Sequence, residues 1–331
     1  MIFGRLRQAL AAGQPSVVAT ITDIQGSTYR RVGAKLWVGA DGEMAGNVSG
    51  GCLEVDVRDQ ALSVIKDGTP KRLHYDTSEA EDRVWGMGLG CNGQVDLLLQ
   101  RYDACHQAFV EAVSERLAAD QPFAIRLGLA EGDRDQRTVL VGEETASSAA
   151  PDCFIDRFEP PPIFLICGAG DDALPLAKLA DEVGFRVALI DHRSAYLTAD
   201  RFPQARWRLS LRPEEGCPAD WPWPQVLAVV KTHAVQLDLE WVQALMAKPI
   251  PYIGLLGPRE RRDEVRAVLA PDQLARLYGP VGLDLGGEGP EQVALSAVAE
   301  ALAVWNGRNG GFLRDRRAAI HATDEGAGDV Q

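Results

Sequence analysis

The segment between residues 163 and 191 constrains the fold more than any other part of the chain. An apolar run, a glycine-rich turn, a helical pattern and a second apolar run follow one another there. Gly168 permits a tight turn, Gly170 lets a phosphate approach the backbone, and Ala173 allows close packing of helix on strand. Asp191 follows the second run, where a carboxylate typically accepts hydrogen bonds from a ribose hydroxyl. The segment therefore predicts a β-α-β nucleotide-binding unit of the Rossmann type.

Two acidic residues, Asp171 and Asp172, follow the glycines directly. A phosphate bound at this turn would lie close to both carboxylates. Aspartate is also a common N-cap of helices, so the pair could instead serve only to begin the helix. An ordinary strand–helix turn that binds no ligand is the alternative that these residues leave open.

The remainder of the C-terminal half continues the same alternation of strand and helix. Short apolar runs occur at residues 163–167, 187–191, 226–231 and 252–256, with helical patterns between them. Such runs are typical of a parallel sheet with helices on both faces. Polar loops follow these strands at the edge where such sheets bind ligands, and the loop after residue 230 contains His233. We therefore treat His233 as a candidate cofactor-binding residue.

The N-terminal half predicts a mixed α/β domain. A short amphipathic helix begins the chain, strands are expected at residues 16–23, 34–38, 72–75 and 95–99, and a helix is expected at 54–66. An extension, residues 103–160, should add a helix and a strand pair. The prolines at 160–162 favour a stiff linker. We accordingly expect domains at 1–160 and 161–305 and a flexible tail at 306–331.

Two glycine/cysteine loops stand out in the N-terminal half. Ser49-Gly50-Gly51-Cys52 leads into a helical pattern, and Gly90-Cys91 lies in a second glycine-rich stretch. Backbone N–H groups of such a loop can form an anion-binding nest, and a nearby helix N-terminus favours the thiolate form of a cysteine. For both cysteines the alternative is a small buried core residue.

Composition excludes several classes of function. The 331 residues carry a net charge of −13, which disfavours nucleic acid and anionic membranes as partners. We find no apolar run long enough to span a membrane and no export signal. The six cysteines form no CxxC pair, so we expect reduced thiols in the cytoplasm.

Several longer stretches resemble one family. GSTYRRVGAKLWVGADGEMAGNVSGGCLEVDV and GMGLGCNG resemble the N-terminal domain of the XdhC/CoxI family. ICGAGDDALPLAKLADEVGFRVALIDHR, VVKTHAVQLD, IGLLGPRERR and GPVGLDLGGEGPEQVALSAVAEAL resemble its C-terminal Rossmann domain. The resemblance spans about residues 10–305 in the family's order. Three positions depart from the usual pattern: Asn92 replaces a glycine, Asp171 a histidine and Pro258 a serine.

The resemblance implies a non-enzymatic accessory protein for molybdenum hydroxylases such as xanthine dehydrogenase and aldehyde oxidoreductase. Such a protein binds the molybdenum cofactor, as molybdopterin or its cytosine dinucleotide, supports its sulfuration with a cysteine desulfurase, and inserts it into the apo-hydroxylase. A nucleotidyltransferase of cofactor synthesis would be a further partner, and a homodimer is expected. The residues that the resemblance assigns to cofactor binding are Ser49, Gly50, Gly51, Cys52, Gly90, Cys91, Gly168, Gly170 and Asp191, and His233 joins them by its place in a strand-end loop. We hypothesise that the Cys52 or the Cys91 thiol faces molybdenum, because a soft thiolate suits molybdenum–sulfur chemistry.

Two other functions remain open at this point. An NAD(P)-dependent oxidoreductase would explain the Rossmann unit, but not the two glycine/cysteine loops, and no catalytic Tyr/Lys or His/Asp set is evident. A nucleotide-sensing regulator would bind NAD but no pterin. Both differ from the carrier in what they should bind.

Overall fold

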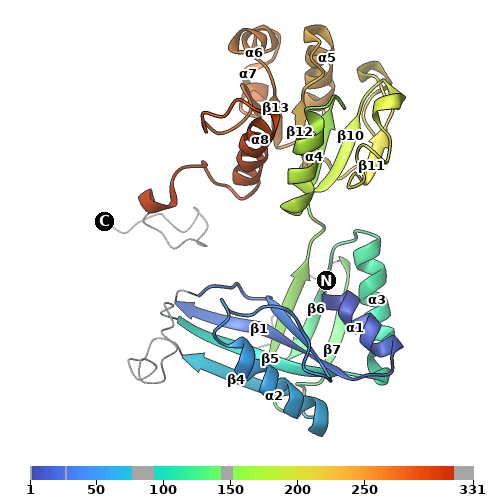
Figure 1. The fold of residues 1–331 in the computed structure, drawn as a ribbon, viewed down its shortest axis with the longest axis vertical. Helices are drawn as coiled ribbons and strands as arrows, with labels where there is room; N and C mark the ends of the chain where they lie inside the picture. Colours follow the sequence, from blue (N-terminus) through green and yellow to red (C-terminus); the bar gives the residue numbers. More distant parts are fainter. Residues whose placement is uncertain (1, 27, 77–92, 143–151, 317–331) are drawn as a thin grey trace. The chain divides into compact units, whose positions relative to one another are not determined.

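The chain divides into two compact units, Met1–Pro160 and Pro161–Gln331. A computed structural model describes residues 2–26, 28–76, 93–142 and 152–316 (Figure 1). Each unit has its own core and is described by itself. The predicted Gly90 and Cys91 lie outside the described residues, as does most of the expected tail. Residues 306–316 of that tail are described and include the short turn η7 (Leu313–Asp315).

An antiparallel sheet forms the centre of the first unit. Its strand order is β3-β2-β1-β5-β4, and its members are β1 (Ser16–Gly26), β2 (Lys35–Gly39), β3 (Met44–Gly46), β4 (Lys71–Asp76) and β5 (Gly93–Tyr102). A hairpin turn at Asp41-Gly42 joins β2 to β3, and Gly42 adopts a φ of 85° there. β1 and β5 extend beyond the predicted strands because their pairing continues to Gly26 and Gly93.

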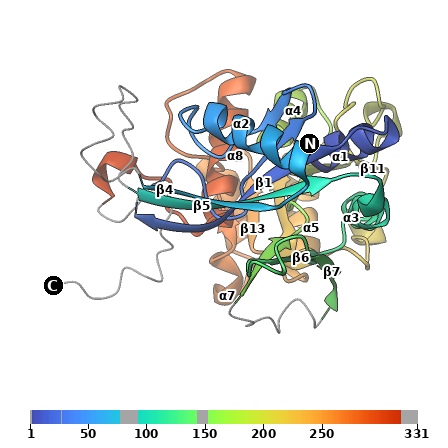
Figure 2. The same cartoon turned by 90° about the horizontal axis from the view of Figure 1, so that it is seen from below.

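Both faces of this sheet are covered. Helix α2 (Glu54–Asp67) packs on one face through Val57, Ala61 and Val64. The other face contacts α1 (Ile2–Ala11), α3 (Gln107–Ala118) and a second sheet of order β7-β6-β8. Its strands are β6 (Phe123–Gly128), β7 (Arg137–Leu140) and β8 (Cys153–Phe158). Figure 2 shows α2 and β6 on opposite sides of β1 and β5.

Two features of the extension differ from the expectation. The helix expected in the extension is preceded by a 3-10 turn, η2 (Ala104–His106), where the Asp103 and His106 side chains form a capping box. Strand β8 was not expected, because its sequence, CFIDRF, places a charged residue at a buried position. That residue, Asp156, forms an ion pair with Lys35 of β2. Burial raises the pKa of Asp156, and the charge and hydrogen bond of Lys35 offset part of that cost.

The second unit is the predicted doubly wound Rossmann domain. Its sheet is parallel, in the order β11-β10-β9-β12-β13-β14, with strands at Trp207–Leu209, Arg186–Ile190, Ile163–Cys167, Val226–Val230, Tyr252–Leu255 and Leu277–Tyr278. The strand order reverses between β9 and β12. In such sheets ligands bind outside the carboxyl ends of the strands at this reversal.

The helices of this unit divide between the two faces of the sheet. Helices α4 (Ala173–Glu182) and α8 (Pro290–Trp305) pack against one face, with Phe164 and Ile166 beneath them. Helices α5 (Val235–Met246) and α6 (Arg259–Arg266) pack against the other, over Leu165 and Cys167. A further short helix, α7, spans Pro271–Leu274.

Two edge strands, β11 and β14, were not predicted from the sequence. They have only three and two residues, which is too short to show an alternation of apolar and polar side chains. Among the described residues, no helix combines the length and apolar character needed to cross a membrane.

Candidate functional site

The glycine turn lies at the reversal of the Rossmann sheet, directly after β9. Gly168 has a φ of 113°, and a Cβ built on it would lie 2.5 Å from the carbonyl oxygen of Lys231. Strands β9 and β12 pair in register up to Cys167 and Val230, so Gly168 and Lys231 lie side by side. Only glycine combines this φ with so close an approach of two backbones. Gly168 is therefore required by the sheet itself.

An internal ion-pair cluster fills the space beside the glycines. The Lys231 side chain is fully buried, and its Nζ donates to Asp172 Oδ1 at 2.6 Å. His233 Nε2 lies 2.9 Å from Asp172 Oδ2. Burial alone would raise the pKa of Asp172, but the hydrogen bond and charge of Lys231 outweigh it and lower that pKa. Asp172 is thus an ionised carboxylate at the turn where a pyrophosphate was expected.

The two aspartates do not act as side-chain caps of α4. Asp172 is the N-cap residue, yet its side chain makes no capping hydrogen bond. The Asp171 carboxylate instead accepts from Arg201 Nη2 at 2.8 Å. Both acids therefore make ion pairs with side chains distant in the sequence.

Asp191 lies directly after β10, where the sequence predicts a ribose-binding carboxylate. It is 4% exposed. Its Oδ2 accepts from the Ala169 backbone N–H and from Arg193 Nη2, each at 2.8 Å, and its Oδ1 accepts from the Arg193 backbone N–H and Nε. Burial raises the pKa of Asp191, but these hydrogen bonds lower it to about 2. This carboxylate fixes the glycine turn to the neighbouring loop, and its contact with a ribose stays a prediction.

The loop that carries Lys231 and His233 is held in an uncommon conformation. His233 has a φ of 63°, which is rare for a residue with a side chain. The buried Asp238 accepts from the Thr232 backbone N–H at 2.8 Å and from its hydroxyl at 2.6 Å. Arg261 of α6 in turn donates to Asp238 at 3.0 Å. These contacts hold the His233 imidazole, 56% exposed, against Asp172.

A pocket of about 230 Å³ opens beside this cluster. It lies between α4 and α8, and Asp172 and Glu288 contribute carboxylates to its lining. The remaining lining residues are apolar: Leu176, Leu256, Pro290, Val293, Ala294 and Ala297. Of the cluster beside the glycines, Asp172 alone contributes to the described lining of this pocket. Gly170 and His233 lie next to Asp172, and Gly168 contacts Lys231.

The residues that define the charge of this site, Lys231 and Asp238, were not predicted from the sequence. Lys231 directly follows a buried central strand, and the parallel register with β9 aligns it with the glycine turn. A lysine at that position needs an acidic partner, and Asp172 is the acid within reach. The ion pair between Lys231 and Asp172 could therefore have been predicted from the sequence. The structural acid Asp238 gave no comparable signal, because an aspartate in an amphipathic helix normally faces water.

The first glycine/cysteine loop is anchored by Glu54. Its carboxylate accepts from the backbone N–H groups of Val48 and Ser49 at 3.1 and 2.8 Å and from the Ser49 hydroxyl. The Ser49 oxygen accepts in turn from the N–H groups of Gly51 and Leu53, both at 3.1 Å. Burial raises the pKa of Glu54, but these hydrogen bonds lower it below its usual value. Glu54 is thus a structural anchor.

This anchoring decides which parts of the loop can meet a ligand. Ser49 is buried and serves the loop, whereas Gly50 and Gly51 are exposed. Cys52 is half-buried, with its side chain against the apolar core under α2. Two interpretations of Cys52, a core residue and a ligand-facing thiol, therefore both retain support.

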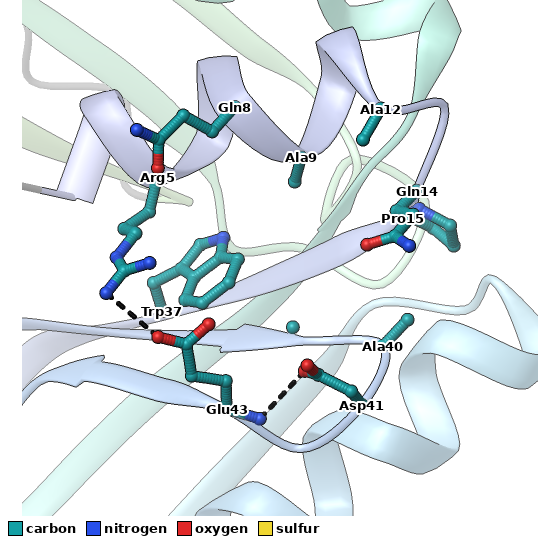
Figure 3. Close-up of a pocket in the computed structure, with 11 residues that line it drawn as sticks. Arg5, Gln8, Ala9, Ala12, Gln14, Pro15, Trp37, Ala40, Asp41 and Glu43 are labelled. Carbon is teal, nitrogen blue, oxygen red and sulfur yellow. Dashed lines mark hydrogen bonds and ion pairs between the residues drawn. The ribbon is translucent and has the colours of Figure 1, made fainter.

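A second pocket lies elsewhere in the first unit. It measures about 150 Å³ and lies between α1 and the β2–β3 hairpin, over Trp37 (Figure 3). Its charged groups are satisfied locally, since Arg5 pairs with Glu43 at 2.8 Å and Asp41 accepts from the Glu43 backbone N–H at 2.9 Å (Figure 3). None of the predicted site residues that the structure describes lines it.

Comparison with known proteins places both units in one family. Residues 9–76 match the model of the XdhC and CoxI family, and residues 164–301 match that of the XdhC Rossmann domain. The chain is 33% identical over 309 residues to a probable xanthine dehydrogenase subunit of Bacillus subtilis (strain 168), covering 87% of this chain and 93% of that protein. It is 25% identical over 308 residues to the molybdenum cofactor insertion chaperone PaoD of Escherichia coli (strain K12), covering 90% and 86%.

A solved structure extends the likeness to three dimensions. The crystal structure of a xanthine dehydrogenase from Bacillus halodurans matches with a TM-score of 0.79 at 30% identity, covering 93% of this chain and 97% of that one. The glycine turn falls within the match to the XdhC Rossmann domain, and the Ser49–Cys52 loop falls within the match to the XdhC and CoxI family. This chain belongs to the XdhC and CoxI family.

Proposed function

We propose that this chain is an accessory protein that carries the molybdenum cofactor to a molybdenum hydroxylase of the xanthine dehydrogenase type. The observation that carries the proposal is the match of both units to one family that includes a relative named as a cofactor insertion chaperone. The cargo is molybdopterin or its cytosine dinucleotide. A cysteine desulfurase and a nucleotidyltransferase would act on the cargo before the apo-hydroxylase receives it, and the carrier would work as a homodimer in the cytoplasm.

The Ser49–Cys52 loop supports a role at the metal end of the cargo. Its backbone is exposed at Gly50 and Gly51, and Glu54 keeps it rigid. Cysteine sulfur is a soft donor that suits metals with sulfur chemistry better than a hard oxygen ligand does. We assign Cys52, together with Cys91, to the molybdenum-facing side of the carrier. The exposed Tyr29 ring lies close to Gly50 and would cover the same surface.

The charge of the glycine turn favours this function over an NAD(P)-dependent oxidoreductase. In dinucleotide-binding domains the turn presents uncompensated N–H groups to a pyrophosphate. Here the Ala169 N–H is bonded to Asp191, and the ionised Asp172 lies beside Gly170. A pyrophosphate placed on this turn would have to displace these groups. A carrier that holds its cargo by another part of the molecule, with the phosphate away from the turn, avoids that cost.

Co-expression with the cofactor pathway tests the proposal. We expect the purified full chain to release a pterin, detected as its fluorescent oxidised form, and to activate an apo-hydroxylase on mixing. Cys52→Ala and Cys91→Ala should lower the pterin content, whereas Cys217→Ala, which removes a half-buried thiol from the Rossmann core, should not. Unchanged loading in both loop variants would rule out a thiol anchor. Saturable NADH binding without any pterin would instead support the oxidoreductase or the nucleotide-sensing regulator.

A further inference from the structure

The pocket beside the glycine turn has an unusual combination of walls and charge. Leu176 of α4 and Val293 of α8 face it with aliphatic side chains, and Leu256 closes it after β13. Its charged lining consists of two carboxylates, from Asp172 and Glu288, and no basic residue among those described contributes to it. Apolar walls of this kind bind the faces of a flat ring. The carboxylates specify what the edge of that ring must offer.

Asp172 is held ready to accept hydrogen bonds. Lys231 and His233 bond to its two oxygens at 2.6 and 2.9 Å and fix its orientation at the pocket wall. Each carboxylate oxygen has a further lone pair beyond the one so used. Lys231 itself is fully buried beneath Asp172, so an incoming ligand meets the carboxylate rather than the ammonium.

This arrangement disfavours a phosphate in the pocket and favours a ring that carries N–H groups. An anionic oxygen would lie against Asp172 and Glu288 without access to a basic side chain in the described lining. A carboxylate is, by contrast, a good acceptor for the exocyclic amino group of a heterocycle, as in the recognition of cytosine by acidic side chains. The ring edge should therefore carry an amino group, beside a ring N–H where the heterocycle has one.

We propose that this pocket binds the amino-substituted heterocyclic ring of the cargo, with Asp172 accepting its N–H groups and the phosphate lying outside. The assignment rests on the proposed carrier function. The glycine motif alone suggests a phosphate at this turn, whereas the assignment places the heterocyclic ring beside the turn and the phosphate outside the pocket. Two parts of the cargo share the required chemistry: the 2-amino-4-oxopyrimidine edge of the pterin and the amino-pyrimidine of cytosine. Pocket occupancy by either ring would leave Gly168 and Asp191 with structural roles.

Titration of the full-length protein with pterin, cytidine and pyrophosphate, each alone, tests the proposal. We expect pterin or cytidine to bind, the stronger of the two naming the ring, and pyrophosphate neither to bind nor to compete. Asp172→Asn should weaken ring binding by about tenfold, the usual effect of losing a hydrogen bond to a charged acceptor. Asp171→Asn is the matched control, because Asp171 is absent from the pocket lining and pairs with Arg201 instead.

A second pair of variants is independent of the Asp172 ion pair. Val293→Trp fills the pocket from α8 and should abolish ring binding. Leu295→Trp places the same side chain on the same helix at a residue that is 51% exposed, and should bind as the wild type does. Ring binding that survives Val293→Trp, or competition by pyrophosphate, would overturn the proposal.

The proposed function can fail separately. Wild-type protein that takes up no pterin in cells would refute the carrier function, and the titrations would still decide the chemistry of the pocket. Equal cofactor loading of wild type and Val293→Trp in cells would refute the pocket assignment and leave the carrier function standing.

Discussion

Replacement of Gly168 by alanine should destabilise the Rossmann unit far more than a glycine replacement in open space. The new Cβ would lie 2.5 Å from the Lys231 oxygen and 2.9 Å from its carbonyl carbon, and neither backbone atom can swing away. Residues forced into sparsely populated φ regions cost about 1–3 kcal/mol, and overpacking adds about 1–3 kcal/mol. The lower entropy of the unfolded alanine chain offsets about 0.4–1 kcal/mol. We expect a net loss of about 1–5 kcal/mol.

Two further glycines supply the controls. Gly184, with a φ of 96°, has no described atom within 4 Å of the position of a Cβ, so Gly184→Ala tests the conformational cost alone. At Gly170 the Cβ would meet Asp172 Oδ1 at 3.0 Å, which is a side-chain atom that can move. Gly170→Ala should therefore cost less than about 1 kcal/mol in stability while it shifts the Asp172 carboxylate.

Urea unfolding of the full chain, followed by tryptophan fluorescence, measures these differences. Trp207, Trp221, Trp223 and Trp241 all lie in the Rossmann unit, so the signal reports mainly on that unit. The two units need not unfold in one transition, and the variants are compared on the transition that these tryptophans report. Gly168→Ala no more destabilising than Gly184→Ala would refute the argument that β9 and β12 require a glycine.

Three other perturbations test the remaining ion pairs and anchors. The pKa of Asp191 is about 2 in the folded protein against 3.8 for the free group. Its ionised form should therefore contribute about 2 kcal/mol of stability above pH 4, and this contribution should disappear as the pH falls toward 2. In Asp191→Asn the urea midpoint should lose this fall in stability at acid pH. Asp156→Ala leaves the buried Lys35 ammonium unpaired and should cost about 3–5 kcal/mol in thermal unfolding, whereas the double replacement Lys35→Met/Asp156→Leu should recover most of it. Glu54→Gln should cost about 1–2 kcal/mol and speed proteolysis next to Gly50, and an unchanged cleavage rate would argue against the anchor.

The sequence predicted the Rossmann unit well because its evidence is local. Buried parallel strands are short uninterrupted apolar runs, and the glycine turn has a fixed spacing, so β9, β10, β12 and β13 could be placed to within about two residues. Helix α2 was equally readable, since Gly68 ends it in a left-handed conformation. Strand β8 could not be predicted, because it is established by pairing with β6, and the partner of its buried Asp156 is Lys35, far away in the sequence.

The sequence predicted the positions of the glycine turn and of the His233 loop in the candidate site, but not the charged groups that surround them. Gly168, Gly170 and His233 lie around the Asp172–Lys231 ion pair, and Asp172 lines the adjacent pocket. The ion pair of Asp172 with Lys231 joins residues that are 59 positions apart, and only the register of β9 with β12 brings them together. Gly90 and Cys91 lie outside the described residues, so their assignment stays a prediction.

The glycine turn shows why a motif's geometry and its ligand must be argued separately. Gly168 is required by the approach of the Lys231 backbone, a contact that exists whatever the domain binds. The glycine pattern therefore reports a tight strand–helix turn beside a neighbouring strand, and it says nothing of the charge that a ligand meets there. That charge is set by Asp172, which Lys231 keeps ionised and in place. With an apolar residue at position 172, the same glycine turn would offer a phosphate the helix N-terminus and the Lys231 ammonium, with no carboxylate of residue 172 between them. Under the proposed carrier function, Asp172 rather than the glycines therefore decides which end of the cargo this domain can hold.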